Sequence, residues 1–464
     1  MAVRAAADGG APPQRCCIAL LPRAIVRRIL ALAPADARLL AAAVCREWRE
    51  MLNERRLWLR VDLSRESGLS HALTEGLLRA ATARAGGALQ SLDVTGCSRQ
   101  LHATLLAVAA ANAGTLRELR IASRRSGFQL FPHESSWTLQ ELQALLRAAP
   151  QLVLLEANAG DSVADARLLL RNEPPFGRLQ LRYLEVEDDA DADQAEVLGL
   201  IADIATHPSL TGLTMQFIAL DAPELVEALV DAALARRLSS LQLDHCSLSP
   251  ASAPALVRLL ASDTVQELAL CNVVSMHEET YEQDRLFDGV AAALLAGALR
   301  ANTTLTALCV QPIGLWDDFD AAAVLLRALV AHPSLRVLNF RDYRHYDAQP
   351  TAAHAAATGE LLGPLVAANT PALTELSVCY CHLRDEALAL LVRALASNTH
   401  LRVLICADNF MSEEFAHDVL LPAVQANSSL RRLYTGHEHE WEHANEAEWI
   451  AQDREDADTQ HQDA

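Results

Sequence analysis

The side chains best suited to chemistry are thinly spread along this chain of 464 residues. His437, His439 and His443 stand among glutamates near the C-terminus, and imidazole nitrogens combine with carboxylates in many metal sites. Their spacing matches no well-defined ligand set. The favoured interpretation is a segment that packs Trp441 and Trp449 over the preceding structure and then continues as an acidic, disordered tail (437–464). We therefore expect no metal and no cofactor.

Nucleophiles and phosphate-binding loops do not occur in a recognisable arrangement either. The sequence has no phosphate loop, no metalloprotease histidine pair and no Gly-x-Ser-x-Gly turn. Its ten cysteines include no C-x-x-C pair, so we expect reduced, structural thiols. The sequence predicts a binding protein with no catalytic residues.

The net charge and the hydrophobicity pattern reduce the classes of partner that the chain is expected to bind. The net charge is −20, and such an acidic surface repels nucleic-acid backbones and anionic lipids. The sequence contains no apolar run long enough for a membrane span and no secretory signal, so we expect a disordered leader over 1–19 and a cytoplasmic or nuclear protein.

A segment of the form L-x-x-L-x-(L/V/I)-x-x-(C/N) recurs along the chain and must organise the rest of it. The basal step of 27–30 residues is long enough for one strand and one helix. Asn or His-Pro stands just before many of these segments, as expected at the end of a helix. The twelve segments begin at Leu89, Leu116, Leu152, Leu181, Leu210, Leu238, Val265, Leu305, Leu335, Leu373, Leu401 and Leu430.

These segments resemble leucine-rich repeats of the ribonuclease-inhibitor type. The resemblance implies an α/β fold, a curved leucine-rich-repeat solenoid of about twelve repeats over 64–436. Parallel strands would line its concave face and helices its convex face, and stacking would bury the leucines in one continuous core.

A second motif precedes the repeats. Leu21-Pro22 opens it, Val44-Cys45-Arg46 and Trp48 lie mid-way, and Leu57-Trp58 stands near its end. It resembles an F-box, the small all-α module that docks a substrate receptor onto the Skp-type adaptor of a Skp–cullin–F-box ubiquitin ligase. The resemblance places such a module over 20–63 and implies that the adaptor binds Leu21, Pro22, Ile25, Ile29, Leu40, Val44, Trp48, Leu57 and Trp58.

Together the two motifs resemble an F-box/leucine-rich-repeat protein, which implies a non-catalytic substrate-recognition subunit. Its partners would be the Skp-type adaptor, a cullin through that adaptor, and a protein target. Ala24, Ala33 and Arg38 depart from the family pattern. Two alternatives stay open. The departures favour a repeat scaffold whose N-terminal helices only cap the solenoid, and the repeats are also similar to those of small-GTPase regulators, for which no arginine can be matched. All basic residues are Arg, and the absence of Lys fits either resistance to self-ubiquitination or a bias in codon usage.

Two sets of side chains are candidates for binding the target. Strand alternation predicts an acidic concave surface in the N-terminal half, where only Arg120 is basic and a basic segment of a partner would be attracted. Three long steps predict aromatic loops along one rim. Ordinary solvated charge and loops folded back onto the solenoid are the alternatives. The predicted residues are Asp93, Glu118, Glu156, Glu185, Glu187, Asp244 and Glu267 on the concave face, and Phe128, Phe131, Trp137, Tyr281, Tyr343 and Tyr346 on the rim.

Overall fold

The computed structural model describes most of the repeat region and part of the N-terminal module. The described residues are 23, 25–26, 30, 38, 41, 46–63, 71–95, 101–121, 137–158, 162–171, 180–187, 192–246, 248–271, 289–311, 319–340, 352–379, 381, 383–407, 409–436, 446–448, 450–452 and 454.

One parallel sheet organises this described part of the chain. Its thirteen strands are hydrogen-bonded to their neighbours in the order of the sequence, so every connection returns the chain to the next position along the sheet. Parallel neighbours need a crossover, and a helix supplies it in most units. The strands are β1 (Arg60–Asp62), β2 (Ser91–Asp93), β3 (Glu118–Arg120), β4 (Leu154–Asn158), β5 (Gln180–Glu187), β6 (Gly212–Gln216), β7 (Ser240–Asp244), β8 (Glu267–Cys271), β9 (Ala307–Gln311), β10 (Val337–Phe340), β11 (Glu375–Ser377), β12 (Val403–Ile405) and β13 (Arg432–Tyr434).

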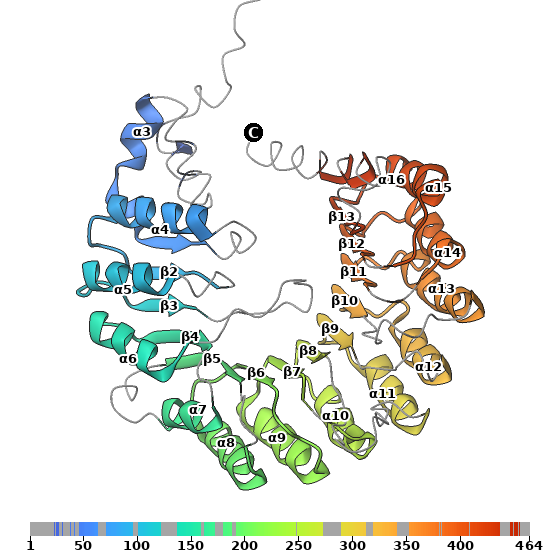
Figure 1. Ribbon diagram of the computed structural model, residues 1–464, viewed down its shortest axis with the longest axis horizontal. Helices are drawn as coiled ribbons and strands as arrows, with labels where there is room; N and C mark the ends of the chain where they lie inside the picture. The colour runs from blue at the N-terminus through green and yellow to red at the C-terminus, as the bar shows by residue number, and fades with distance from the viewer. Residues whose placement is uncertain are drawn as a thin grey trace, which may run out of the picture.

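The helices form a second layer. Figure 1 shows the strands along the inner side of an arc and the helices along its outer side, with α3 near one end and α16 near the other. The helical elements are α3 (Arg46–Leu52), η2 (Arg55–Trp58), α4 (His71–Ala85), α5 (His102–Ala111), α6 (Leu139–Ala148), α7 (Val163–Leu170), α8 (Gln194–Thr206), α9 (Pro223–Arg236), η6 (Pro250–Ser252), α10 (Ala253–Leu260), α11 (Gly289–Ala301), α12 (Phe319–Leu329), α13 (Ala352–Ala367), α14 (Asp385–Leu395), α15 (Glu413–Phe415), the π-helical turn η8 (Ala416–Leu420) and α16 (Leu421–Ala426).

The predicted alternation of strand and helix is confirmed. Of strands β2–β13, all but β5 lie within the predicted segments, and β5 begins one residue earlier, at Gln180. The first strand was not predicted. β1 pairs with β2 through Val61 and Leu92, although Arg60–Asp62 was assigned to the helical module. The last residues of the predicted module are therefore the first strand of the sheet.

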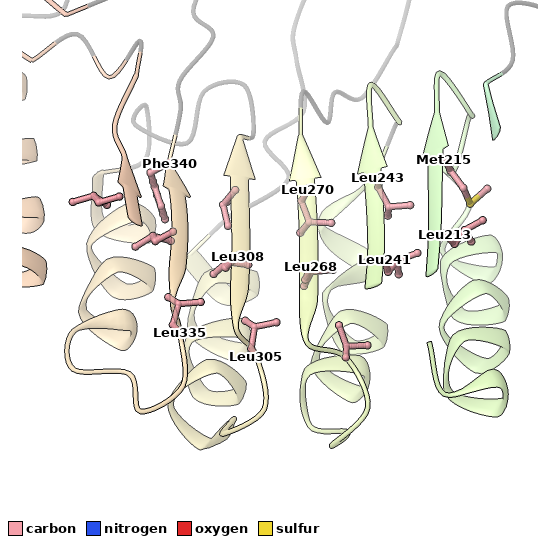
Figure 2. Close-up of a cluster of buried hydrophobic side chains, with 14 of the residues drawn as sticks. Leu213, Met215, Leu241, Leu243, Leu268, Leu270, Leu305, Leu308, Leu335 and Phe340 are labelled. Carbon is pink, nitrogen blue, oxygen red and sulfur yellow. The ribbon is translucent and has the colours of Figure 1, made fainter. Parts of the chain in front are cut away.

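The leucines of the repeated segment form ladders across the strands. Leu213, Leu241, Leu268 and Leu308 occupy successive register positions from β6 to β9. Their side chains point from the sheet toward the helical layer in Figure 2, and each is buried. Burying one such side chain contributes about 2 kcal/mol, so the ladder explains why single units need their neighbours.

Buried asparagines join one repeat to the next at the ends of helices. The Asn398 Nδ2 donates to the Val366 carbonyl at 2.8 Å, while its Oδ1 accepts from the amides of His400 at 2.9 Å and Leu401 at 2.7 Å. Asn302 and Asn427 do the same: the Nδ2 donates to a carbonyl at the end of a helix of the preceding repeat, and the Oδ1 accepts from the amides two and three residues later. The asparagine predicted only as an end-of-helix residue therefore also bonds to the preceding repeat.

No helix in the described part of the chain is long and apolar enough to cross a membrane.

Candidate functional site

Trp58 lies between the N-terminal module and the first repeat. Its side chain is completely buried, and the indole Nε1 donates to the Leu52 carbonyl at 2.6 Å. The guanidinium carbons of Arg38 and Arg84 lie 5.5 and 5.4 Å from the ring centroid, within the range of cation–π attraction. Arg84 belongs to α4, so this stack ties the module to the first helix behind the sheet.

Arg38 strengthens the same junction. Its Nη1 donates to the carbonyl of Leu57 and, at 3.4 Å, to that of Arg60, at the start of β1. Burial lowers the pKa of Arg38 from its ordinary value, and Asp62 opposes this shift. The departure from the apolar family pattern at this position thus has a local explanation, since the arginine binds backbone carbonyls where the module meets the sheet.

The residues predicted to bind the adaptor divide into three groups. Leu57 and Trp58 are buried within this chain, at the point where the module meets the sheet. Ile25 is exposed, at 46%, and Trp48 is partly buried against the core. The other five lie outside the described residues: Leu21, Pro22, Ile29, Leu40 and Val44.

The predicted acidic surface is partly neutralised by Arg120. Its Nη1 lies 3.2 Å from Asp93 Oδ2, and its Nε lies 3.3 Å from Glu156 Oε1. Burial alone would lower the pKa of Arg120, but Glu156, Asp93 and Glu118 together raise it. The three strands β2, β3 and β4 therefore carry an ion-pair cluster across the sheet.

The expectation that these acidic side chains face solvent is wrong for Glu156 and Asp244, which are only 4% and 7% exposed. On a surface lined by neighbouring strands, adjacent side chains cover one another. The Asp244 Oδ1 lies 2.9 Å from the Nδ1 of His245. Glu267, in contrast to both buried carboxylates, is exposed. Glu185 and Glu187 belong to β5, and their side chains lie outside the described part of the structure.

The predicted rim of aromatic residues is described at only one position. Trp137 is 5% exposed and lies edge-on to His102, with ring centroids 5.0 Å apart. This residue belongs to the core and is not an exposed contact, because the neighbouring repeat covers it. Phe128, Phe131, Tyr281, Tyr343 and Tyr346 lie outside the described residues.

An exposed aromatic contact that sequence reasoning missed follows β6 and β7. Phe217 is 40% exposed, and its ring centroid lies 4.7 Å from that of His245. Both residues have left-handed backbones, with φ of 55° and 51°, which large side chains seldom adopt. The sequence signal was a large aromatic residue directly after a strand. Its contact with His245 arises only when the two neighbouring repeats pack side by side.

In the part of the chain that the structure describes, no group of three or more His, Cys, Asp and Glu side chains is placed to hold a metal ion. The candidate ligands His437, His439 and His443 lie outside that part of the structure.

Comparison with known proteins identifies the class of the N-terminal module. Residues 18–64 match the family described as F-box-like, so the chain carries an F-box-like domain. No curated protein matches the chain. A solved structure, leiomodin-1 actin-binding site 2, is 15% identical over 43% of this chain and 86% of that chain, with a TM-score of 0.24.

Proposed function

We propose that this protein is the substrate-recognition subunit of a Skp–cullin–F-box type ubiquitin ligase. The F-box-like domain at residues 18–64 is the observation that carries the proposal. F-box domains typically bind Skp-type adaptors. On this proposal the chain is no enzyme itself, and it accelerates ubiquitin transfer by holding a target close to the assembled ligase.

The junction between module and sheet supports this role. Trp58 and the carbonyl bonds of Arg38 connect the module to β1 and α4 directly. A target held on the sheet would then keep a defined orientation relative to the adaptor. A loosely tethered module would lose that orientation.

The strand-and-helix units are proposed to be leucine-rich repeats whose sheet surface binds the target. The 27–30-residue step and the sequential parallel strands support this assignment. Because Arg120 already pairs with Asp93 and Glu156, a basic segment of the target has to compete with it for those carboxylates.

Adaptor binding tests the proposal. We expect the full chain to co-purify with a Skp-type adaptor in a stoichiometric complex. Ile25→Asp should weaken that complex by about tenfold or more, because a carboxylate would be buried in an apolar interface. Leu198→Asp is the matched control: Leu198 is exposed to a similar degree, at 41%, on α8, outside the module.

Circular dichroism should give the same melting temperature for both variants. Equal adaptor affinity of the two variants would remove Ile25 from the interface. A folded wild-type chain that forms no complex would overturn the ligase role and leave a repeat scaffold with a helical cap.

A further inference from the structure

Two cysteines approach each other on neighbouring strands of the sheet. The Sγ atoms of Cys271, at the end of β8, and Cys309, in β9, are 3.1 Å apart. Leu268 and Leu270 point toward the helical layer in Figure 2, so alternation places Cys271 on the opposite, inner side. Together with Ala269, the two cysteines form a small buried cluster separate from the main core.

The other described cysteines have different surroundings. Cys246 and Cys381 direct their Sγ atoms at backbone carbonyls, those of Met215 at 3.4 Å and Phe340 at 3.3 Å. Burial raises the pKa of Cys246 to about 12, and burial also raises that of Cys406. Such thiols stay protonated and unreactive. Cys271 is the most exposed of the six described cysteines, at 9%.

We propose that Cys271 and Cys309 form a reversible disulfide when the protein meets hydrogen peroxide. The Cys271 thiolate attacks one peroxide oxygen, the O–O bond breaks, and Cys271 becomes a sulfenic acid as the other oxygen leaves as water. The Cys309 sulfur then attacks the Cys271 sulfur, the S–O bond breaks, and a second water leaves. Two thiols lose two electrons and two protons, and one peroxide is reduced to two waters.

The strand register explains why this bond would be reversible. Cys309 pairs with Ala269, and Cys271 pairs with Gln311, so the two cysteines occupy diagonal positions. A disulfide requires the sulfurs to approach by about 1 Å more, which draws the ends of β8 and β9 together. Bonds that distort their surroundings are more readily reduced by cellular thiols. Oxidation would thus alter the inner surface of the sheet and close the chain from 271 to 309 into a loop, independently of any role in a ligase.

Tryptic digestion is well suited to the test, because the chain contains no Lys and cleavage after Arg separates the two cysteines. Cys271 is the single cysteine of peptide 259–285, and Cys309 is the single cysteine of peptide 301–327. The reduced full chain is treated with hydrogen peroxide, its free thiols are blocked with N-ethylmaleimide, and the digest is analysed by mass spectrometry. We expect these two peptides to be joined at the sum of their masses less two hydrogens, and to separate with dithiothreitol.

Variants and a denatured sample make the outcome decisive. Cys309→Ser should abolish the joined peptide, whereas Cys379→Ser should leave it unchanged. Oxidation in urea should give mixed pairings, since the proximity depends on the fold. If folded wild-type protein yields both peptides carrying only N-ethylmaleimide, or joins Cys271 equally to other cysteines, the proposal is wrong.

Discussion

Asn398 shows how a single polar residue can hold two repeats together. Its amide is buried and makes one hydrogen bond backward and two forward, so both ends of the side chain are used. Leucines alone would bury surface without defining how far one repeat is rotated against the next. Directional hydrogen bonds to backbone groups fix this rotation.

Removing the Asn398 side-chain amide should therefore lower the free energy of unfolding by more than the loss of a few side-chain atoms would. Asn398→Ala removes the bond to the Val366 carbonyl, which keeps the one from the Asn369 amide, and leaves the His400 and Leu401 amides without the Asn398 Oδ1. We expect the free energy of unfolding to fall by about 2–4 kcal/mol. Ser397→Ala, one residue earlier and exposed, removes only a local bond to Ala394 and should change it by less than about 0.5 kcal/mol. Urea denaturation followed by circular dichroism measures both. Equal effects would show that the bonds of Asn398 contribute nothing beyond the ordinary loss of a side chain.

Two histidines stand where other repeats have asparagine. His207 and His332 precede Leu210 and Leu335 by three residues, as Asn398 precedes Leu401. Both are buried, and burial lowers the pKa of each below its ordinary value of 6.5, aided at His207 by Arg236. The folded protein therefore binds fewer protons at these sites than the unfolded chain.

This difference predicts a pH-dependent stability. The contribution of the two histidines is complete above about pH 6.5 and is lost as the pH falls below that value, because only the unfolded chain then gains the protons. We expect the melting temperature of the wild type to drop between pH 7 and pH 5 by more than that of the H207N/H332N double variant. His417→Asn, at an exposed histidine of the helical layer, serves as a comparison variant. Parallel pH profiles for all three proteins would contradict the assignment.

At the scale of elements, helix α13 packs unusually close to α14. A Cβ added at Gly359 would lie 2.5 Å from the Ala387 Cα and 2.7 Å from its carbonyl oxygen, closer than side-chain contacts allow. The same atom added at Gly363, one turn later in α13, would lie 3.5 Å from the Leu390 Cβ, an ordinary contact. Both glycines belong to α13, but only Gly359 is held close to α14 in a way that excludes a Cβ.

Gly→Ala substitutions at these positions should have opposite signs. Alanine favours a helix over glycine by roughly 0.5–1 kcal/mol, so Gly363→Ala should be neutral or stabilising. Gly359→Ala must push α14 away and should destabilise by about 1–3 kcal/mol despite the same gain in propensity. Thermal denaturation of the pair compares them directly. A stabilised Gly359→Ala variant would mean that the two helices can separate at no cost.

The strands were predictable because leucines alternate within each segment and the segments recur with a basal step of 27–30 residues, and both patterns are visible in the sequence. The burial of Trp58 and Trp137 was not predictable, since each lies against a helix from elsewhere in the sequence, Trp58 against Arg84 of α4 and Trp137 against His102 of α5. The same applies to Arg120, whose two partners lie on strands 27 and 36 positions away in sequence.

At the scale of the molecule, the end of the sheet is covered by a later segment. The Glu448 Oε1 accepts from the Thr435 amide and hydroxyl, both at 2.6 Å, and the Arg454 Nη2 donates to the Val424 carbonyl at 2.7 Å. Ala447 and Ala451 are fully buried. Repeat arrays need such covering at their ends because the last unit has a neighbour on one side only.

Deletion of residues 446–464 should act locally. We expect amide hydrogen exchange to become faster in β12 and β13, whereas β2–β4 keep their rates, because each repeat is stabilised mainly by its neighbours. Glu448→Ala should give a smaller change at the same strands. Hydrogen exchange with mass spectrometry resolves these regions, and a uniform rise across the sheet would show that the repeats unfold as one cooperative unit.

The arc of Figure 1 has a consequence for direction. Strands lie about 4.8 Å apart and helices about 9 Å apart, and over layers separated by about 10 Å this mismatch turns the chain by roughly 20° per unit. The number of units between the two ends therefore sets the angle between them as well as the distance. Deleting one internal unit would leave both ends folded but would rotate the C-terminal end relative to the F-box-like domain. A molecule bound at that end would then have a different orientation relative to that domain.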